Sequence, residues 1–311
     1  MAREAAVIGW GYSELSRDSS DPLGGMAIEA CTNALKSAGL SPSDVDGVCT
    51  FPNVPYGYPY GYGLTPPRQG IDVVGCGYLV DRMGLDRVRW FAEVSDGMLA
   101  GAIVEGIGAI EAGGCEVVLV WRAMHYAREN YSKFPSVEAT GAAQFAAPYG
   151  LVSVIQWHGL AYRMYLERYG KDRSGTAALA VQSRRFASKN DNAFFRGQPL
   201  TEDDYYAARM ISSPLGLFDC DIPVQGCGAV VLAASSVAQG GGRRIARVAG
   251  YAQGSYVSDG RPNFVVEDQI SVGERTTRRA LERAGVSIED VDVARNCMTA
   301  SVRLRSTGSR R

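Results

Sequence analysis

The stretch of sequence best suited to chemistry is Val94-Ser95-Asp96-Gly97, together with the apolar segment that follows it. Ser95 and Asp96 are residue types that cap helix N-termini. Residues 98–110 are apolar or small at nearly every position, which is typical of a buried helix. The positive end of the helix dipole would then be available to a negative charge that develops during a reaction. The other interpretation is a core helix without chemistry.

Three glycines lie inside this predicted helix, at Gly101, Gly106 and Gly108. Each costs about 1 kcal/mol relative to alanine in a helix interior, so we expect another helix or a ligand to approach closely there. The apolar run of residues 116–121 follows and predicts a buried strand. The helix is therefore expected to lie between two strands.

Cysteine and histidine usage limits the possible chemistry. Seven cysteines are spread along the chain without a Cys-x-x-Cys pair, which argues against a disulfide framework and a zinc site and favours a reducing, cytoplasmic location. There are only two histidines, His125 and His158, so a mechanism that needs several is excluded. The net charge of −1 indicates neither nucleic acid nor an anionic membrane as a partner. No apolar run approaches the roughly 20 residues of a membrane span.

A basic cluster lies on a second predicted helix, residues 177–190. It consists of Arg184, Arg185 and Lys189, which could bind an anionic group such as a nucleotide phosphate. A solvated basic face is an equally open interpretation.

An internal repeat organises the rest of the chain. Residues 5–50 and 245–293 each predict a strand that ends in a glycine turn, a helix that ends in Ala-Gly, and a short acidic segment. From the helix onward the matches share one offset of 246 positions: Ala34-Leu35 with Ala280-Leu281, Ala38-Gly39 with Ala284-Gly285, and Ser41, Asp44, Val45 and Asp46 with Ser287, Asp290, Val291 and Asp292. A repeat of this length indicates a duplicated strand–helix unit.

A strand–helix unit duplicated around a buried glycine-rich helix resembles the thiolase fold. Between Tyr149 and Ala234 the segments YGLVSVIQWHGLAYRMYLERYG, SRRFASKNDNAFFR, PLTEDDYYAARMISSPLGLFDCDIP and QGCGAVVLA resemble the thiolases related to sterol carrier protein, also called lipid-transfer proteins. The resemblance extends to about residue 294. It implies an α/β thiolase fold, in which duplicated five-stranded mixed sheets and buried central helices form the layers αβαβα.

The resemblance also implies how the chain is divided. It predicts an N-terminal half at residues 1–240, with a mostly helical insertion at about 122–218, and an incomplete C-terminal half at residues 241–311. From about residue 295 the hydrophobic periodicity stops. With one choice of codons, a shift of reading frame near that point restores the family's Leu-Tyr-Asp-Cys-Phe. We therefore expect an aberrant tail there, which would put the activity of this exact chain in doubt.

Two departures from the thiolases bear on function. Thiolases carry a nucleophilic cysteine at the N-terminus of the central helix, where this chain has residues 94–97, and Ser95 has no visible base to activate it. Gln225-Gly226 stands where thiolases usually have Asp-Gly. Acyl transfer through a cysteine is therefore not expected.

The sequence is similar to the cysteine-free members of this branch, the steroid side-chain aldolases, which cleave β-hydroxyacyl-CoA thioesters to a ketone and a shorter acyl-CoA. The resemblance implies a retro-aldol reaction that needs a base for the hydroxyl and donors for the thioester enolate. No cofactor beyond the CoA thioester itself is expected. Ser95 and Gly97 would bind the thioester, and Arg184, Arg185 and Lys189 would bind the CoA.

The base in such enzymes is expected to be a tyrosine, whose pKa near 10 must fall for it to act at neutral pH. Tyr251 follows the first strand of the second repeat, on the side where this fold builds its active site, and is the first candidate. Tyr256 is the second candidate. His125, directly after the strand that follows the central helix, is the third. Each of these side chains could instead be structural.

Two other functions stay open. One is a thiolase-type acyltransferase that uses an unrecognised nucleophile, and the other is a non-catalytic lipid- or acyl-CoA-binding subunit. The resemblance further implies a homodimer and a small OB-fold, zinc-ribbon partner associated with acyl-CoA. The tyrosine-rich residues 51–63, or the helical insertion, could contact that partner.

Overall fold

The computed structural model describes residues 3–17, 20–52, 70–71, 73–94, 98–125, 144–151, 154–222, 224–238, 245–254 and 266–293. The first elements are β1 (Ala5–Tyr12), α1 (Leu23–Ala38), η1 (Pro42–Asp44), β2 (Gly47–Thr50), α2 (Cys76–Met83), β3 (Trp90–Glu93), α3 (Met98–Glu111) and β4 (Val117–Met124). The chain continues with η4 (Ala147–Tyr149), α4 (Val154–Tyr169), α5 (Ser174–Ala187), α6 (Glu202–Ala207), β5 (Met210–Ser212), β6 (Leu215–Gly216) and η5 (Leu217–Asp219). The last elements are β7 (Gly226–Ala234), α7 (Ser235–Ala238), β8 (Ala246–Arg247), α8 (Val266–Ala284) and η6 (Ile288–Asp290).

One mixed sheet forms the centre of the N-terminal half. Its strand order is β3-β2-β4-β7-β1-β8. β2 is parallel to both β3 and β4, whereas β7 is antiparallel to both β4 and β1. The two residues of β8 extend the sheet beyond β1. The predicted five-stranded mixed sheet is therefore present as β3-β2-β4-β7-β1.

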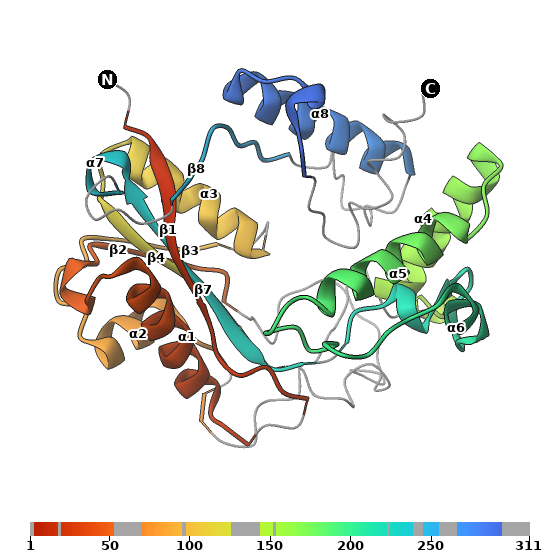
Figure 1. Cartoon of the computed structure of the whole chain (residues 1–311), viewed down its shortest axis with the longest axis horizontal. Coiled ribbons are helices and arrows are strands. Elements are labelled where there is room, and N and C mark those ends of the chain that lie inside the picture. The colour runs from red at the N-terminus through yellow and green to blue at the C-terminus, as the bar shows by residue number, and fades with distance from the viewer. Residues whose placement is uncertain are drawn as a thin grey trace.

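The layers follow the predicted order as far as the described residues extend. Buried side chains of α1 and α2 pack on one face of the sheet, and those of α3 pack on the other. Val248 and Tyr251, in the segment after β8, pack against the cluster around α3. Figure 1 shows α8 beyond that segment, on the side away from the sheet. The layers are therefore, in order, the helices α1 and α2, the sheet, α3, the extended segment after β8, and α8.

Close contact between strand and helix explains two glycines and supports the repeat. A Cβ atom on Gly9 of β1 would lie 2.6 Å from the carbonyl oxygen of Ala34 in α1. A Cβ atom on Gly250 would lie 2.3 Å from the carbonyl oxygen of Ala280 in α8. Since Ala34 and Ala280 are partners in the 246-residue offset, the two halves pack strand on helix in the same way.

The close approach to α3 is found at one of its glycines, and it comes from the sheet instead of the predicted second helix or ligand. A Cβ atom on Gly106 would lie 2.9 Å from Cδ1 of Leu232 in β7, so this glycine lets α3 rest on the sheet. A Cβ atom on Gly108 would meet no described atom within 4 Å. In the part of the chain that the structure describes, Gly108 therefore has no packing reason to be small.

The insertion between β4 and β7 has its own polar core. Arg173 Nη2 lies 3.3 Å from Asp219 Oδ2, and both side chains are largely buried. The Tyr205 hydroxyl donates to the other carboxylate oxygen of Asp219, and the Gly216 amide donates to Oδ2 at 2.7 Å. One carboxylate thereby ties α5, α6 and η5 together.

Within the described ranges no helix combines the length and apolarity needed to cross a bilayer.

Candidate active site

The candidate site lies at one edge of the central sheet. Because β2, β3 and β4 are parallel, their C-terminal ends meet at this edge, where β7 begins. α3 links β3 to β4 and therefore starts at the same edge, at Met98. The predicted helix after residues 94–97 and the strand after it are confirmed. Ser95 and Gly97 themselves lie outside the described residues.

His125 stands at this edge, opposite a buried amide. In the antiparallel pairing of β4 with β7, the last pair is Met124 opposite Gly226. The next residue after Met124 is His125, and the residue before Gly226 is Gln225, so these two lie next to each other. The Gln225 side chain, only 3% exposed, hydrogen-bonds to the imidazole. Burial lowers the pKa of His125 below its ordinary value, and the bond to Gln225 opposes that shift. The imidazole is therefore neutral at pH 7 and can accept a proton.

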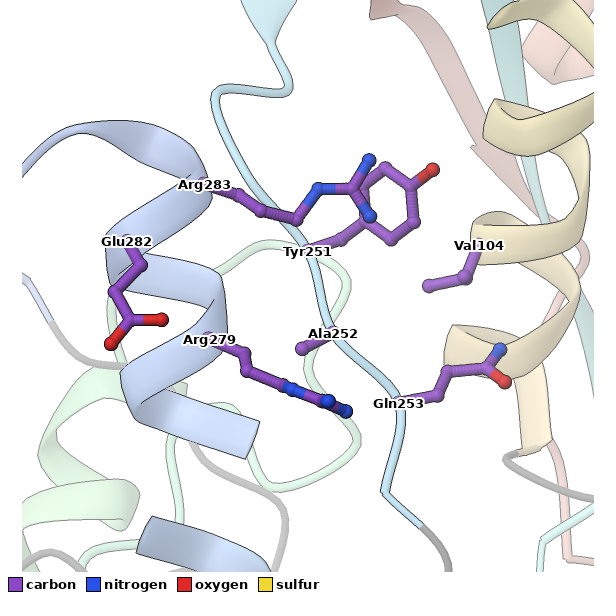
Figure 2. A pocket seen from close by; sticks show the side chains of 7 residues that line it. All are labelled: Val104, Tyr251, Ala252, Gln253, Arg279, Glu282 and Arg283. Atoms are coloured by element: carbon purple, nitrogen blue, oxygen red, sulfur yellow. The ribbon is translucent and has the colours of Figure 1, made fainter. Parts of the chain in front are cut away.

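Tyr251 is engaged with the far end of α3. Its hydroxyl donates to Oε2 of Glu111 at 2.7 Å, and the Arg283 guanidinium lies 3.9 Å from the centre of its ring. Figure 2 shows Tyr251 and Arg283 on the wall of a cavity of about 570 Å³, with Val104 of α3 opposite. Burial, followed by the bond to the Glu111 carboxylate, raises the pKa of Tyr251 above its ordinary value. A raised pKa disfavours the phenolate that a base requires.

The position of Glu111 locates the Tyr251 hydroxyl. Glu111 is the last residue of α3, which has 14 residues and is therefore about 20 Å long. The hydroxyl thus lies at the opposite end of α3 from its first residue, Met98. The structure brings His125 to the edge where α3 begins and does not bring the Tyr251 hydroxyl there. Tyr256 lies outside the described residues, and the base role of each of the three stays a prediction.

The basic cluster divides into a packed member and two exposed ones, and Lys189 lies outside the predicted helix because α5 ends at Ala187. The Arg184 guanidinium lies 3.7 Å from the centre of the Phe195 ring, and its Nη1 donates to the Gln198 carbonyl at 3.1 Å. Burial lowers the pKa of Arg184 from its ordinary value. Arg185 and Lys189 are exposed. Arg184 thus has a structural contact, while the CoA-binding role of all three stays a prediction.

The described cysteines are poor nucleophiles. Burial is the main cause that raises the pKa of Cys115 and Cys220 to about 11, and that of Cys49 and Cys227 to about 12. Burial also raises the pKa values of Cys31 and Cys76. Because the thiolate is the reactive form, none of these six is activated. In the same part of the chain, no group of three or more His, Cys, Asp or Glu side chains could hold a metal ion.

Two polar contacts were not anticipated from sequence. From sequence, Gln225 was noted only as a departure from the family pattern. Its position directly before a buried strand could have predicted that it lies at the same end of the sheet as the site. Glu111 ends the central helix and gave no signal, because its partner Tyr251 is 140 positions away.

Solved structures identify the architecture. An SCP2-thiolase-like protein type 1 of Mycobacterium smegmatis, described as monomeric, superposes with a TM-score of 0.68 at 16% identity, covering 98% of this chain and 63% of that one. The chain has the thiolase fold. A second thiolase-fold neighbour, the Ltp2-ChsH2(DUF35) aldolase, superposes with a TM-score of 0.74 at 26% identity and covers 93% of this chain and 71% of that one.

Sequence comparison relates this thiolase-fold chain to aldolases. It is 29% identical over 260 residues to a steroid side-chain-cleaving aldolase of Thermomonospora curvata, covering 81% of this chain and 62% of the relative. It is 26% identical over 248 residues to a 17-hydroxy-3-oxo-4-pregnene-20-carboxyl-CoA lyase of Mycobacterium tuberculosis, covering 77% and 60%. The chain therefore spans about 60% of the length of these two relatives. No family model matches it.

Proposed function

We propose that this chain carries the substrate site of an aldolase that cleaves a β-hydroxyacyl-CoA thioester of the steroid side-chain type. The observation that carries the proposal is the combination of aldolase relatives with a set of described cysteines that are all protonated at neutral pH. Acyl transfer needs a thiolate at the start of the central helix, and residues 94–97 contain no cysteine. Retro-aldol cleavage needs none.

The chemistry requires a base and an oxyanion site. The base takes the proton of the β-hydroxyl, the carbonyl of the ketone product forms, and the bond between the α- and β-carbons breaks. The electron pair moves into the thioester enolate, whose oxygen the amide groups at the start of α3 would stabilise. Protonation of the α-carbon completes the shorter acyl-CoA. Atoms and charges balance without a cofactor.

Among the candidate bases, the geometry favours His125 over Tyr251. His125 is at the sheet edge where α3 begins, and its lowered pKa keeps a lone pair available at pH 7. Tyr251 has a raised pKa and donates its proton to Glu111. Arg185, in the last turn of α5, and Lys189, two residues after that helix ends, are both exposed and remain available for the phosphates of CoA.

The test is to incubate the chain with a tertiary β-hydroxyacyl-CoA and to follow the ketone and the shorter acyl-CoA by liquid chromatography and mass spectrometry. We expect both products in equal amounts and no acyl adduct on the protein. An acyl adduct would replace the proposal with a thiolase-type reaction. Binding of the thioester without cleavage would leave a non-catalytic acyl-CoA-binding subunit.

Two variants then assign the base. His125→Gln should lower turnover by about 10²–10⁴-fold, the usual contribution of a general base. Tyr251→Phe should leave turnover nearly unchanged, because only the bond to Glu111 is lost. If Tyr251→Phe lowered turnover and His125→Gln did not, Tyr251 would be the better candidate for the base.

The assembly proposed here has two further parts. The resemblance to the Ltp2-ChsH2(DUF35) aldolase supports a second protein, which we expect to be a small OB-fold, zinc-ribbon protein associated with acyl-CoA. A homodimer is supported by the free edge of β3, which pairs with β2 and with no other described strand. Scattered cysteines without a Cys-x-x-Cys pair support a reducing, cytoplasmic location.

A further inference from the structure

The outer edge of β1 is satisfied by two short polar side chains of α1. β7 pairs with one side of β1, and β8 covers the other side at only two residues. Beyond β8, the Trp10 amide donates to Oγ of Ser37 at 3.4 Å, and Nδ2 of Asn33 donates to the Tyr12 carbonyl at 3.0 Å. Helix α1 thereby supplies hydrogen-bond partners for the backbone along this edge.

The second half of the chain has arginines where the first half has these side chains. Its helix follows the offset of 246 positions, and its strand is aligned by Gly250, which contacts α8 as Gly9 contacts α1. The equivalent pairs of residues are Trp10 with Tyr251, Asn33 with Arg279 and Ser37 with Arg283. A guanidinium is only a donor, so neither arginine can accept a hydrogen bond from the Tyr251 amide. This amide has no partner among the described residues.

Both arginines line the cavity of about 570 Å³ that Figure 2 shows. Its other walls include Val104 of α3 and residues 251–253. In Figure 2 the Arg279 and Arg283 side chains reach from α8 toward residues 251–253, whereas the Glu282 carboxylate turns away from both. The volume lies in the range of sites that hold small organic molecules.

Arg283 is held in place before any ligand binds. Its guanidinium lies 3.9 Å from the centre of the Tyr251 ring, and its Nη2 lies 3.6 Å from Oε2 of Glu111. The ring orients the plane of the guanidinium, and the carboxylate balances its charge. The side chain is nevertheless 51% exposed, so its other N–H groups can be reached. Because this cation is already ordered, binding an anion costs it little conformational entropy.

Arg279 lies one helical turn before Arg283 and supplies a second cation. Side chains four residues apart in a helix are neighbours. In the part of the chain that the structure describes, Arg279 forms no ion pair and no hydrogen bond. Two neighbouring guanidinium groups can share one oxyanion through charge-assisted hydrogen bonds. The cavity therefore has an unbalanced positive charge next to three sources of N–H donors, which are Arg279, Arg283 and the Tyr251 amide.

Two of the remaining wall residues, Val104 and Ala252, are apolar. A small inorganic anion would contact the donors and leave these two side chains in water. An apolar group that carries an oxyanion would cover both kinds of wall, and burial of its hydrocarbon would add to the free energy of binding.

We propose that this cavity binds an organic carboxylate with a compact apolar body. The carboxylate oxygens accept hydrogen bonds from Arg279, Arg283 and the Tyr251 amide, and the apolar body lies against Val104 and Ala252. A planar carboxylate matches the donor fork of a guanidinium, which is why arginine suits this role.

The proposed site is separate from the candidate active site. Glu111, which contacts both Tyr251 and Arg283, is the last residue of α3. His125 stands at the other end, at the sheet edge where α3 begins. The proposal therefore does not depend on the activity proposed above, and it is tested without turnover.

The test uses cyclohexanecarboxylate as the probe and the isotope-labelled, 311-residue chain. An NMR titration follows the backbone amides of residues 251–253, and we expect saturable shifts that fit one site. Cyclohexanecarboxamide, the neutral analogue, should bind at least about tenfold more weakly because it loses the charge-assisted hydrogen bonds. Acetate, which lacks the apolar body, should also bind at least about tenfold more weakly.

Two glutamine variants make the test specific for Arg279. Arg279→Gln should weaken binding of cyclohexanecarboxylate by at least about tenfold, because a hydrogen bond between charged groups is lost. The thermal midpoint of the free protein should not change, since Arg279 is exposed and has no described partner. Arg278→Gln makes the same change at the neighbouring exposed position, which does not line the cavity, and should leave binding within twofold.

Three results would overturn the proposal. The first is the absence of saturable shifts in residues 251–253 with cyclohexanecarboxylate. The second is equally tight binding of the carboxamide or of acetate. The third is equal weakening by Arg279→Gln and Arg278→Gln, which would indicate general attraction to the basic surface of α8. None of these results depends on catalytic activity, so they leave the proposed aldolase reaction untouched.

Discussion

At the scale of single residues, the protonation state of His125 decides whether it can serve as a base. Burial disfavours the imidazolium and lowers the pKa, so the neutral form persists to a lower pH than in an ordinary histidine. A base works only when it is unprotonated. The value of kcat/KM should therefore fall as the pH drops through this lowered pKa, and it should be insensitive to pH just above it.

Gln225 offers a way to move that pKa. Gln225→Glu would place a carboxylate against the imidazole, which favours the charged form and should shift the acid limb of the pH profile to higher pH. Proton NMR of the histidine ring checks the same shift without activity, because the chain has only two histidines and His158→Gln assigns the signals. An unmoved His125 titration in Gln225→Glu would show that the amide does not contact the ring.

At the scale of elements, replacing two different glycines with alanine should change the free energy of unfolding in opposite directions. Gly9→Ala should lower the free energy of unfolding by about 1–3 kcal/mol, because the new Cβ would lie 2.6 Å from the Ala34 carbonyl oxygen and β1 must move away from α1. Gly108→Ala should raise it by about 0.5–1 kcal/mol, because no described atom lies within 4 Å and alanine favours the helix. Urea unfolding of both variants measures the difference. A destabilised Gly108→Ala would mean that α3 has a neighbour at that position.

The buried ion pair of the insertion gives a second comparison. Asp219→Ala should destabilise the fold by about 3–5 kcal/mol, because Arg173 is left buried without its carboxylate. Asp191→Ala removes an exposed partner of Arg196, at 2.8 Å, and should cost at most about 1 kcal/mol. Thermal or urea unfolding of the two variants should therefore rank them clearly. Equal effects would mean that the Asp219 network does not hold α5, α6 and η5 together.

The same scale shows what the sequence could and could not predict. α3 was predictable because a run that is apolar or small at nearly every position, between two strands, has few other interpretations. The repeat was predictable because both halves keep the same cap residues. The contact of Tyr251 with Glu111 was not, since it joins residues from different elements across 140 positions. The neighbours of the helical glycines were not predictable either, because sequence does not show which element approaches: Gly106 faces Leu232 of the sheet, and an added Cβ on Gly108 would meet no described atom within 4 Å.

At the scale of the whole molecule, the free edge of the sheet bears on assembly. Among the strands that the structure describes, β3 is the outermost, and Phe91 in this strand is 69% exposed. An exposed aromatic on an unpaired strand edge is a site where a second chain can pair. A second copy related by two-fold symmetry would place two such edges side by side, which supports the proposed homodimer through β3.

Phe91→Lys should therefore dissociate the dimer, because two like charges would face each other across the paired edges. Light scattering coupled to size exclusion should show the mass of two chains for the parent protein and of one for the variant at the same concentration. The matched control is Glu282→Lys, which adds a lysine on α8, at the other side of the molecule from β3, and should leave the dimer intact (Figure 1). A parent protein that is already monomeric, as its M. smegmatis neighbour is described to be, would remove the homodimer and leave the β3 edge to another partner.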